Sequence, residues 1–128
     1  ERGKILYKIG AGFKKKGRYG QARSYYQKAL AANPSMGKAY LAISQMYASS
    51  AKNCGTDNFS KRAVYWLAAQ EARKAGRVDP NLRKASSNTA ANYMAKAPSK
   101  GEVFESGRSG ETLKIGCWIG RSVKVPKL

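Results

Sequence analysis

Two apolar stripes with helical spacing occupy residues 3–36. The stripe of a first helix follows the i, i+3, i+4, i+7 pattern that places side chains on one helix face: Leu6, Ile9, Gly10 and Phe13. The stripe of a second helix consists of Ala22, Tyr26 and Ala29. Gly17 can end the first helix in the left-handed conformation, and Pro34 cannot continue the second. The pattern therefore predicts two antiparallel helices that approach closely at small residues.

The same pattern returns in a second unit that is longer than the first. Its first helix has Tyr40, Ile43, Ser44 and Tyr47 at the matching positions. Its second helix, about residues 61–76, carries Ala68, Ala72 and Ala75. The prolines that close the two units, Pro34 and Pro80, are 46 residues apart, so the second unit holds 12 extra residues. The turn formers between residues 48 and 59 place the insertion there, and Asp57 or Ser60 could cap the helix that follows.

These units resemble the tetratricopeptide repeat family, whose repeat is 34 residues long. In residues 3–36, eight positions carry the residue types that the family prefers: Leu6, Ile9, Gly10, Phe13, Ala22, Tyr26, Ala29 and Pro34. The resemblance extends to about residue 96, where a third unit has Ala90 and Tyr93 in place but Ser86 at a position expected to be large and apolar. The resemblance implies a mainly α fold of antiparallel helix pairs, with about two and a half repeats and five helices.

From Gly107 the spacing changes from the helical period to alternation. Residues 112–117 and 122–125 predict a small β-hairpin that buries Leu113, Ile115, Val123 and Val125. An isolated hairpin is marginal in water, so we expect it to pack on the last helix. Before it, Ser99 and Glu102 can form a capping box for one short helical turn, whose Val103 and Phe104 would cover the end of the stack. We expect a repeat domain over 1–98, with the insertion at about 48–59, and a C-terminal cap over 99–128.

The two cysteines bear on the compartment. Cys54 in the insertion and Cys117 in the hairpin could form a disulfide, worth roughly 2–4 kcal/mol and typical of an oxidising compartment such as the periplasm. Two separate buried thiols are the alternative, which the sequence alone favours by a small margin. The tail around Gly116-Cys117-Trp118-Ile119 is similar to tails of tetratricopeptide proteins from Bacteroidetes-type bacteria. We expect a periplasmic or cell-envelope location, with the cytoplasm as the alternative.

Charge indicates what kind of partner the chain would attract. The sequence has 25 Lys and Arg against 7 Asp and Glu, a formal net charge of +18, and such an excess attracts acidic partners. The resemblance implies that the first helices of the units line a groove for a partner's peptide or helix. The residues expected to line it are Lys4, Tyr7, Lys14, Lys15, Lys38, Leu41, Gln45 and Lys84. Lys4, Lys38 and Lys84 would form a ladder along one edge; ordinary solvated lysines are the alternative reading.

The chemistry of the side chains points away from catalysis. The chain has no histidine, the commonest general base and metal ligand, and its two cysteines are too few and too far apart for a zinc site. We expect no cofactor and no metal. The sequence predicts a non-catalytic protein-binding or scaffolding module, a subunit or part of a larger assembly, with an acidic partner.

Binding of nucleic acid, anionic glycan or a membrane surface through the basic face is the alternative function. Basic residues interleave with aromatic rings that could stack on bases. However, five of these rings are already assigned to the repeat core: Phe13, Tyr26, Tyr40, Tyr47 and Tyr93. No apolar run approaches the roughly 20 residues that a membrane-spanning helix needs.

Overall fold

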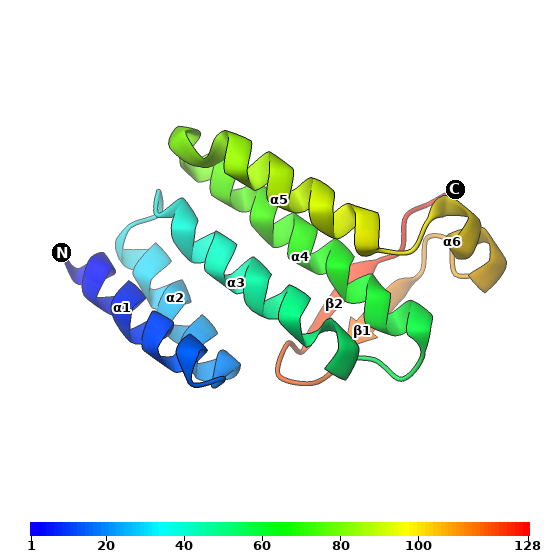
Figure 1. Cartoon of the computed structure of the whole chain (residues 1–128), viewed down its shortest axis with the longest axis horizontal. Coiled ribbons are helices and arrows are strands. Elements are labelled where there is room, and N and C mark those ends of the chain that lie inside the picture. Colours follow the sequence, from blue (N-terminus) through cyan, green and yellow to red (C-terminus); the bar gives the residue numbers. More distant parts are fainter.

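The fold is mainly α-helical, as predicted. A computed structural model describes all of residues 1–128. The elements follow in the order α1 (Arg2–Lys15), α2 (Tyr19–Ala32), α3 (Gly37–Ser50), η1 (Ala51–Asn53), α4 (Asn58–Val78), η2 (Pro80–Leu82), α5 (Arg83–Lys96), α6 (Lys100–Ser106), β1 (Thr112–Ile115) and β2 (Arg121–Lys124). Figure 1 shows them as a row of helices that runs from the N-terminus to α6.

The helices pair as the two apolar stripes predict. α1 packs along α2, α3 along α4, and α4 also along α5, whereas α2 and α3 touch each other much less. Gly10 allows the close approach of α1 and α2, because a Cβ added there would lie 3.0 Å from Cδ1 of Tyr26. Gly17 ends α1 with φ of 77°. These contacts position α1, α3 and α5 as the first helices of three successive units.

The chain has six α-helices, not the predicted five. The sixth is α6, a seven-residue helix where the sequence predicted one short turn. Its capping box is complete: the Ser99 amide donates to Glu102 Oε1 at 2.9 Å, and the Glu102 amide donates to Ser99 Oγ at 3.2 Å. Gly107, at φ of 70°, ends the helix. Backbone groups at both ends of α6 therefore have local hydrogen-bond partners, and these stabilise a helix of about two turns.

The second helix of the second unit is also longer than predicted. α4 runs over Asn58–Val78, where the sequence predicted about residues 61–76. Asp57 caps its start, because the Ser60 amide donates to Asp57 Oδ1 at 2.7 Å. The first of the inserted residues extend α3 to Ser50, and the next form η1. The rest, which include Cys54, connect η1 to α4.

The C-terminal hairpin is antiparallel, with Leu113 opposite Val123. Ile115, Val123 and Val125 are buried and Leu113 is half-buried, so the predicted buried face is confirmed. The hairpin packs on α4, however, and not on α5, which is the last repeat helix. Figure 1 shows it crossing behind α4. Ile115, Ile119, Val123 and Val125 belong to the same hydrophobic core as the repeat helices.

Phe104 does not cover the end of the stack. Its side chain is 77% exposed, whereas neighbouring Val103 is buried in the main core. Val103 and Phe104 are adjacent on α6, so their side chains point in different directions: Val103 faces the core and Phe104 faces solvent.

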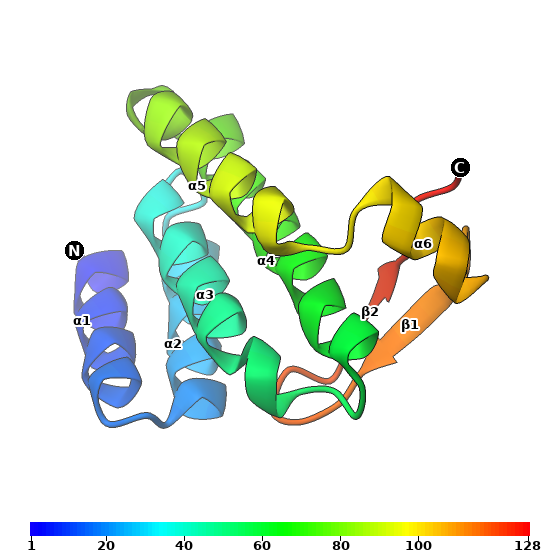
Figure 2. The same cartoon turned by 45° about the vertical axis from the view of Figure 1, so that its right-hand side comes forward.

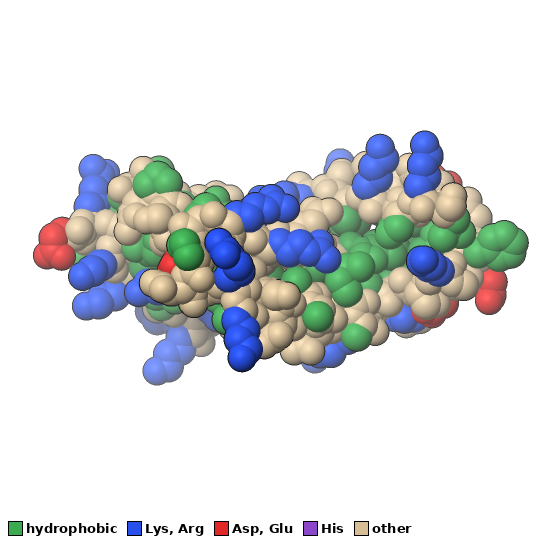
Figure 3. Space-filling view, turned by 90° about the horizontal axis from the view of Figure 1, so that it is seen from above, with side chains coloured by type: hydrophobic (Ala, Val, Ile, Leu, Met, Phe, Trp, Pro, Cys, Tyr) green, Lys and Arg blue, Asp and Glu red, His purple; other side chains and the backbone are tan.

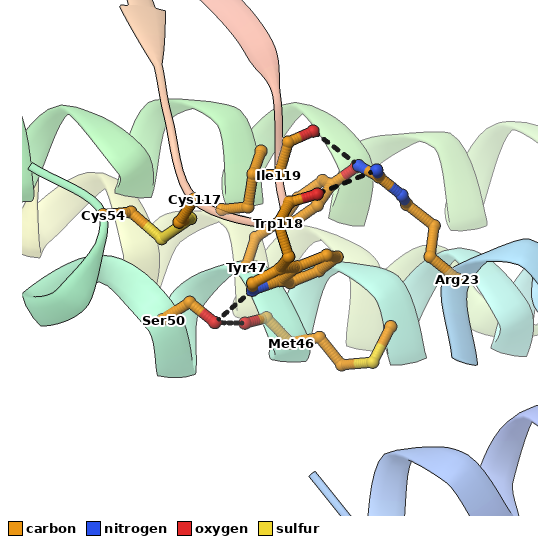
Figure 4. The surroundings of a disulfide bond; sticks show 8 residues. All are labelled: Arg23, Met46, Tyr47, Ser50, Cys54, Cys117, Trp118 and Ile119. Carbon is orange, nitrogen blue, oxygen red and sulfur yellow. Dashed lines mark hydrogen bonds between the residues drawn. A yellow bond between two sulfur atoms is a disulfide. The ribbon is translucent and has the colours of Figure 1, made fainter. Parts of the chain in front are cut away.

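The turn of the hairpin, residues 116–120, is held between α2 and α3 by three kinds of contact (Figure 4). The Trp118 indole donates to Ser50 Oγ at 2.8 Å. The Arg23 guanidinium donates to the carbonyls of Ile119 at 2.8 Å and Trp118 at 3.1 Å. Cys54 and Cys117 form a disulfide with a Cα–Cα distance of 5.3 Å, so the small preference for two free thiols was wrong. These contacts hold the turn of the hairpin beside α2 and α3.

A buried carboxylate completes the attachment of β2. Glu71 of α4 has a side chain that is 6% exposed, and its Oε1 accepts from Arg121 at 3.1 Å and Lys74 at 3.0 Å. Arg121 also donates to the Tyr47 hydroxyl at 3.3 Å. Burial disfavours a charge unless it is paired, so this cluster fixes β2 against the second unit.

Candidate protein-binding face

Two contacts join the first helices of the first two units. The Lys38 ammonium of α3 lies 4.4 Å from the centroid of the Tyr7 ring of α1. The Lys14 ammonium of α1 donates to Gln45 Oε1 of α3 at 2.6 Å. Tyr7 and Lys14 are seven residues apart, as are Lys38 and Gln45, so the contacts are spaced by about 10.5 Å along both helices. We call the surface formed by these four residues the α1–α3 face.

The Tyr7 ring, at one end of the α1–α3 face, packs against a buried aromatic ring. The Tyr7 ring lies 5.2 Å from the buried Tyr26 ring, centroid to centroid. Burial raises the pKa of Tyr7, and burial together with Tyr7 raises the pKa of Tyr26 to about 12. The Tyr7 hydroxyl therefore keeps its proton and can donate a hydrogen bond to a partner.

The other end of the α1–α3 face has a cation in a partly desolvated position. Burial lowers the pKa of Lys14, because removing water disfavours the ammonium. Its amide partner, Gln45, is neutral and leaves the charge uncompensated. A carboxylate placed beside Lys14 would favour the charged form, so this end is suited to an acidic group.

The remaining predicted groove residues are not brought into this arrangement. Leu41 is half-buried against a small core of Ala69, Ala72 and Ala90. Lys4, Lys15 and Lys84 are exposed, and their side chains form no hydrogen bond or ion pair. The structure thus joins Tyr7, Lys14, Lys38 and Gln45 in pairs, and the ladder of Lys4, Lys38 and Lys84 stays a prediction.

Most of the basic side chains have no acidic partner. The four ion pairs engage Arg62, Lys74, Arg108 and Arg121, out of 25 Lys and Arg. Seen from above, Lys and Arg side chains are spread along the molecule, whereas the few acidic ones lie mostly toward its ends (Figure 3). The surface potential is therefore positive over most of the molecule.

The sequence interpretation missed one basic surface. A groove between α4 and α5 has Arg73, Arg77 and Arg83 among its lining residues. The signal for it was present: Arg83 occupies the first position of the third unit, where the first two units have Gly3 and Gly37. The structure brings no group of three or more His, Cys, Asp or Glu side chains together that could hold a metal ion. None of its helices combines the length and apolar character needed to cross a membrane.

Residues 3–36 match the family model of the tetratricopeptide repeat. This is the segment that holds α1, α2 and the turn into α3. No match was found among curated proteins or among solved structures.

Proposed function

We propose that this chain is a non-catalytic module that binds another protein through the α1–α3 face, because residues 3–36 match the family model of the tetratricopeptide repeat. Tetratricopeptide repeats generally mediate protein–protein interaction or scaffolding. The observation that carries the proposal is the pair of contacts, Tyr7 with Lys38 and Lys14 with Gln45. They place an aromatic ring and two ammonium groups along neighbouring first helices, where a partner's segment could lie across both.

The partner that suits this face is an acidic segment of a protein. Lys14 has no carboxylate beside it, and the chain as a whole carries a formal charge of +18. Exposed ion pairs contribute about 0.2–1 kcal/mol each, so two lysines give a modest affinity that salt weakens. Selectivity would then depend on the fixed Tyr7 ring as well as on charge.

The test is binding of labelled acidic peptides, followed by fluorescence anisotropy over a salt series. We expect the double variant Lys14→Gln and Lys38→Gln to weaken binding by up to about tenfold. The matched control is Lys16→Gln and Lys52→Gln, which removes the same charge from two exposed sites outside the face. Equal weakening by both pairs would show that general charge, and not this face, binds the peptide.

Nucleic acid, anionic glycan and anionic membrane surfaces are the alternative ligands. The number of basic side chains without an acidic partner favours them, because each such side chain can contact a phosphate or sulfate. A gel-shift with single-stranded DNA at physiological salt, beside the peptide titration, separates the two functions. Tight binding of DNA that the face variant leaves unchanged would favour the alternative.

The proposal includes a place in a larger assembly. Ile5 and Ile9 lie one turn apart on α1 and are 60% and 39% exposed, although Ile9 belongs to the apolar stripe predicted for this helix. The matching positions in the second unit, Ala39 and Ile43, are buried. An apolar strip at positions that are otherwise covered supports docking of α1 on another subunit. Sedimentation with Ile5→Gln and Ile9→Gln tests this, since the variant should lose any self- or co-assembly.

We further propose a periplasmic or cell-envelope location. The Cys54–Cys117 disulfide supports it, because disulfides persist in oxidising compartments and are rare in the cytosol. Thiol labelling of the protein in intact cells, quenched with acid, tests the location. Two freely labelled thiols would indicate a reducing compartment.

A further inference from the structure

The third unit has one helix, α5, which packs along α4 of the second unit. In the first unit, α2 covers the side of α1 that carries Gly3 and Gly10. By the spacing of the units, the corresponding residues of α5 are Arg83 and Ala90. Both line an open groove of about 600 Å³ between α4 and α5. The groove therefore lies along the line where α4 and α5 meet, on the side of α5 that carries Arg83.

Arg83 stands at the position where the first two units have glycine. At the same position in the second unit, a Cβ added to Gly37 would lie 2.7 Å from the Ala75 carbonyl oxygen of α4. In the first unit, a Cβ added to Gly3 would lie 3.2 Å from Cβ of Asn33. Glycine at the first position thus lets the paired helix pass closely in the first two units. In the third unit the glycine is on the other helix, since a Cβ added to Gly76 of α4 would lie 3.2 Å from Cα of Arg83. α4 can therefore pass close to Arg83, whose side chain stays exposed on the groove.

The groove is cationic and its charges are free. Arg73 and Arg77, one turn apart on α4, and Arg83 on α5 form no ion pair and no side-chain hydrogen bond. The eight residues that line the groove include no Asp or Glu: Arg73, Gly76, Arg77, Arg83, Ser86, Ser87, Ala90 and Ala91. A guanidinium binds a carboxylate or phosphate through two parallel hydrogen bonds. Three unpaired guanidinium groups on one groove are therefore a site for oxyanions.

We propose that the groove between α4 and α5 binds an acidic segment of a protein, separately from the α1–α3 face. Its lining has no aromatic residue, so it offers no ring on which bases could stack, as single-stranded nucleic acid usually requires. Ala90 and Ala91 instead give a floor of small side chains that a peptide backbone can approach. Residues 83–91 of α5 span about 12 Å, a length that about four extended residues cover.

The test uses a labelled peptide of about eight residues that alternates Glu and Ala, which extends past the groove at both ends. Its binding is measured by fluorescence anisotropy to the full chain. The variant replaces Arg73, Arg77 and Arg83 by Gln, and we expect it to weaken binding by about tenfold or more. The matched control, Lys16→Gln with Lys52→Gln and Lys124→Gln, removes three charges from exposed sites elsewhere and should change binding less than about twofold.

Two further arms make the outcome specific. Replacing the three arginines by Lys keeps the charge but loses the two-pronged guanidinium geometry, so binding should still fall by several-fold. A peptide with Gln in place of Glu should not bind. Equal loss in the arginine and control triples would overturn the proposal, and so would unchanged binding of the peptide by the arginine triple. Because Lys14 and Lys38 are unchanged in these variants, failure here leaves the proposal for the α1–α3 face standing.

Discussion

The Arg23 guanidinium lies 5.0 Å from the centroid of the Trp118 ring and donates to the Trp118 carbonyl at 3.1 Å. These residues are 95 positions apart, and they join α2 to the turn of the hairpin (Figure 4). Because α2 and α3 touch each other little, the hairpin turn packs between the first two units and contacts both. The ring of Trp118 also contacts Tyr19 of α2 and Tyr47 of α3, with centroids 5.5 and 5.4 Å away.

We predict that Arg23→Ala lowers the free energy of unfolding by about 1–3 kcal/mol, because the Trp118 and Ile119 carbonyls lose their donor. Urea denaturation followed by circular dichroism measures the change. The control is Arg18→Ala, at an exposed side chain next to α2, which should alter stability by less than about 0.5 kcal/mol. A similar small effect at both positions would mean that the hairpin does not hold α2.

The disulfide makes a second prediction. Cys54 and Cys117 are separated by 63 residues, and closing a loop of this length restricts the unfolded chain. The double variant Cys54→Ser and Cys117→Ser should be less stable by about 2–4 kcal/mol. Reductant should lower the thermal midpoint of the native chain and leave that of the double variant unchanged. A midpoint that is insensitive to reductant in both proteins would contradict the bond.

The pair of Glu102 and Arg62 predicts a pH dependence. Hydrogen bonds from Arg62, and then from the Ser99 amide, lower the pKa of Glu102 to about 2. A folded-state pKa below the unfolded value of about 4.5 gives stability that is present above pH 4.5 and lost as the pH falls toward 2. The stability difference between the native chain and Glu102→Gln should therefore be constant near neutral pH and shrink below about pH 4.5.

Thermal unfolding between about pH 2 and 7 measures that difference. The control is Glu105→Gln, at an exposed neighbour on α6 that forms no ion pair. A difference for Glu102→Gln that stays level to pH 2 would show that the ion pair does not form in solution.

The parts of the fold that could be predicted from the sequence are those set by local spacing. The faces of α1 and α2 follow from residues three and four positions apart, and the capping box of α6 from Ser99 and Glu102. The position of the hairpin could not be predicted, because it depends on contacts between distant residues. Trp118 with Ser50 and Arg23 with Ile119 join positions 68 and 96 apart, and no periodic pattern marks them.

The candidate site was predicted to a similar extent. Unit spacing placed Tyr7, Lys14, Lys38 and Gln45 on first helices, but the pairing of their side chains depends on how α1 lies against α3. The groove between α4 and α5 depends on how these two helices approach each other, which the spacing of residues within one helix does not show. A motif search looks for residues that fit a repeat, and so it passes over an Arg83 that departs from one.

Gly37 provides a direct test of helix packing in the second unit. A Cβ there would lie 2.7 Å from the Ala75 carbonyl oxygen and 3.0 Å from Cβ of Asp79, and neither neighbour is the flexible end of a side chain. We predict that Gly37→Ala forces α3 and α4 apart and lowers the free energy of unfolding by about 1–3 kcal/mol.

Gly12→Ala is the matched control, because Gly12 is exposed within α1 and a Cβ there meets nothing within 4 Å. That substitution should stabilise the chain by about 0.5–1 kcal/mol through helix propensity. Two changes of opposite sign in urea denaturation would establish that the first position of the second unit needs glycine. If Gly37→Ala were instead as stabilising as Gly12→Ala, the close approach of α4 would not be the reason for glycine at this position.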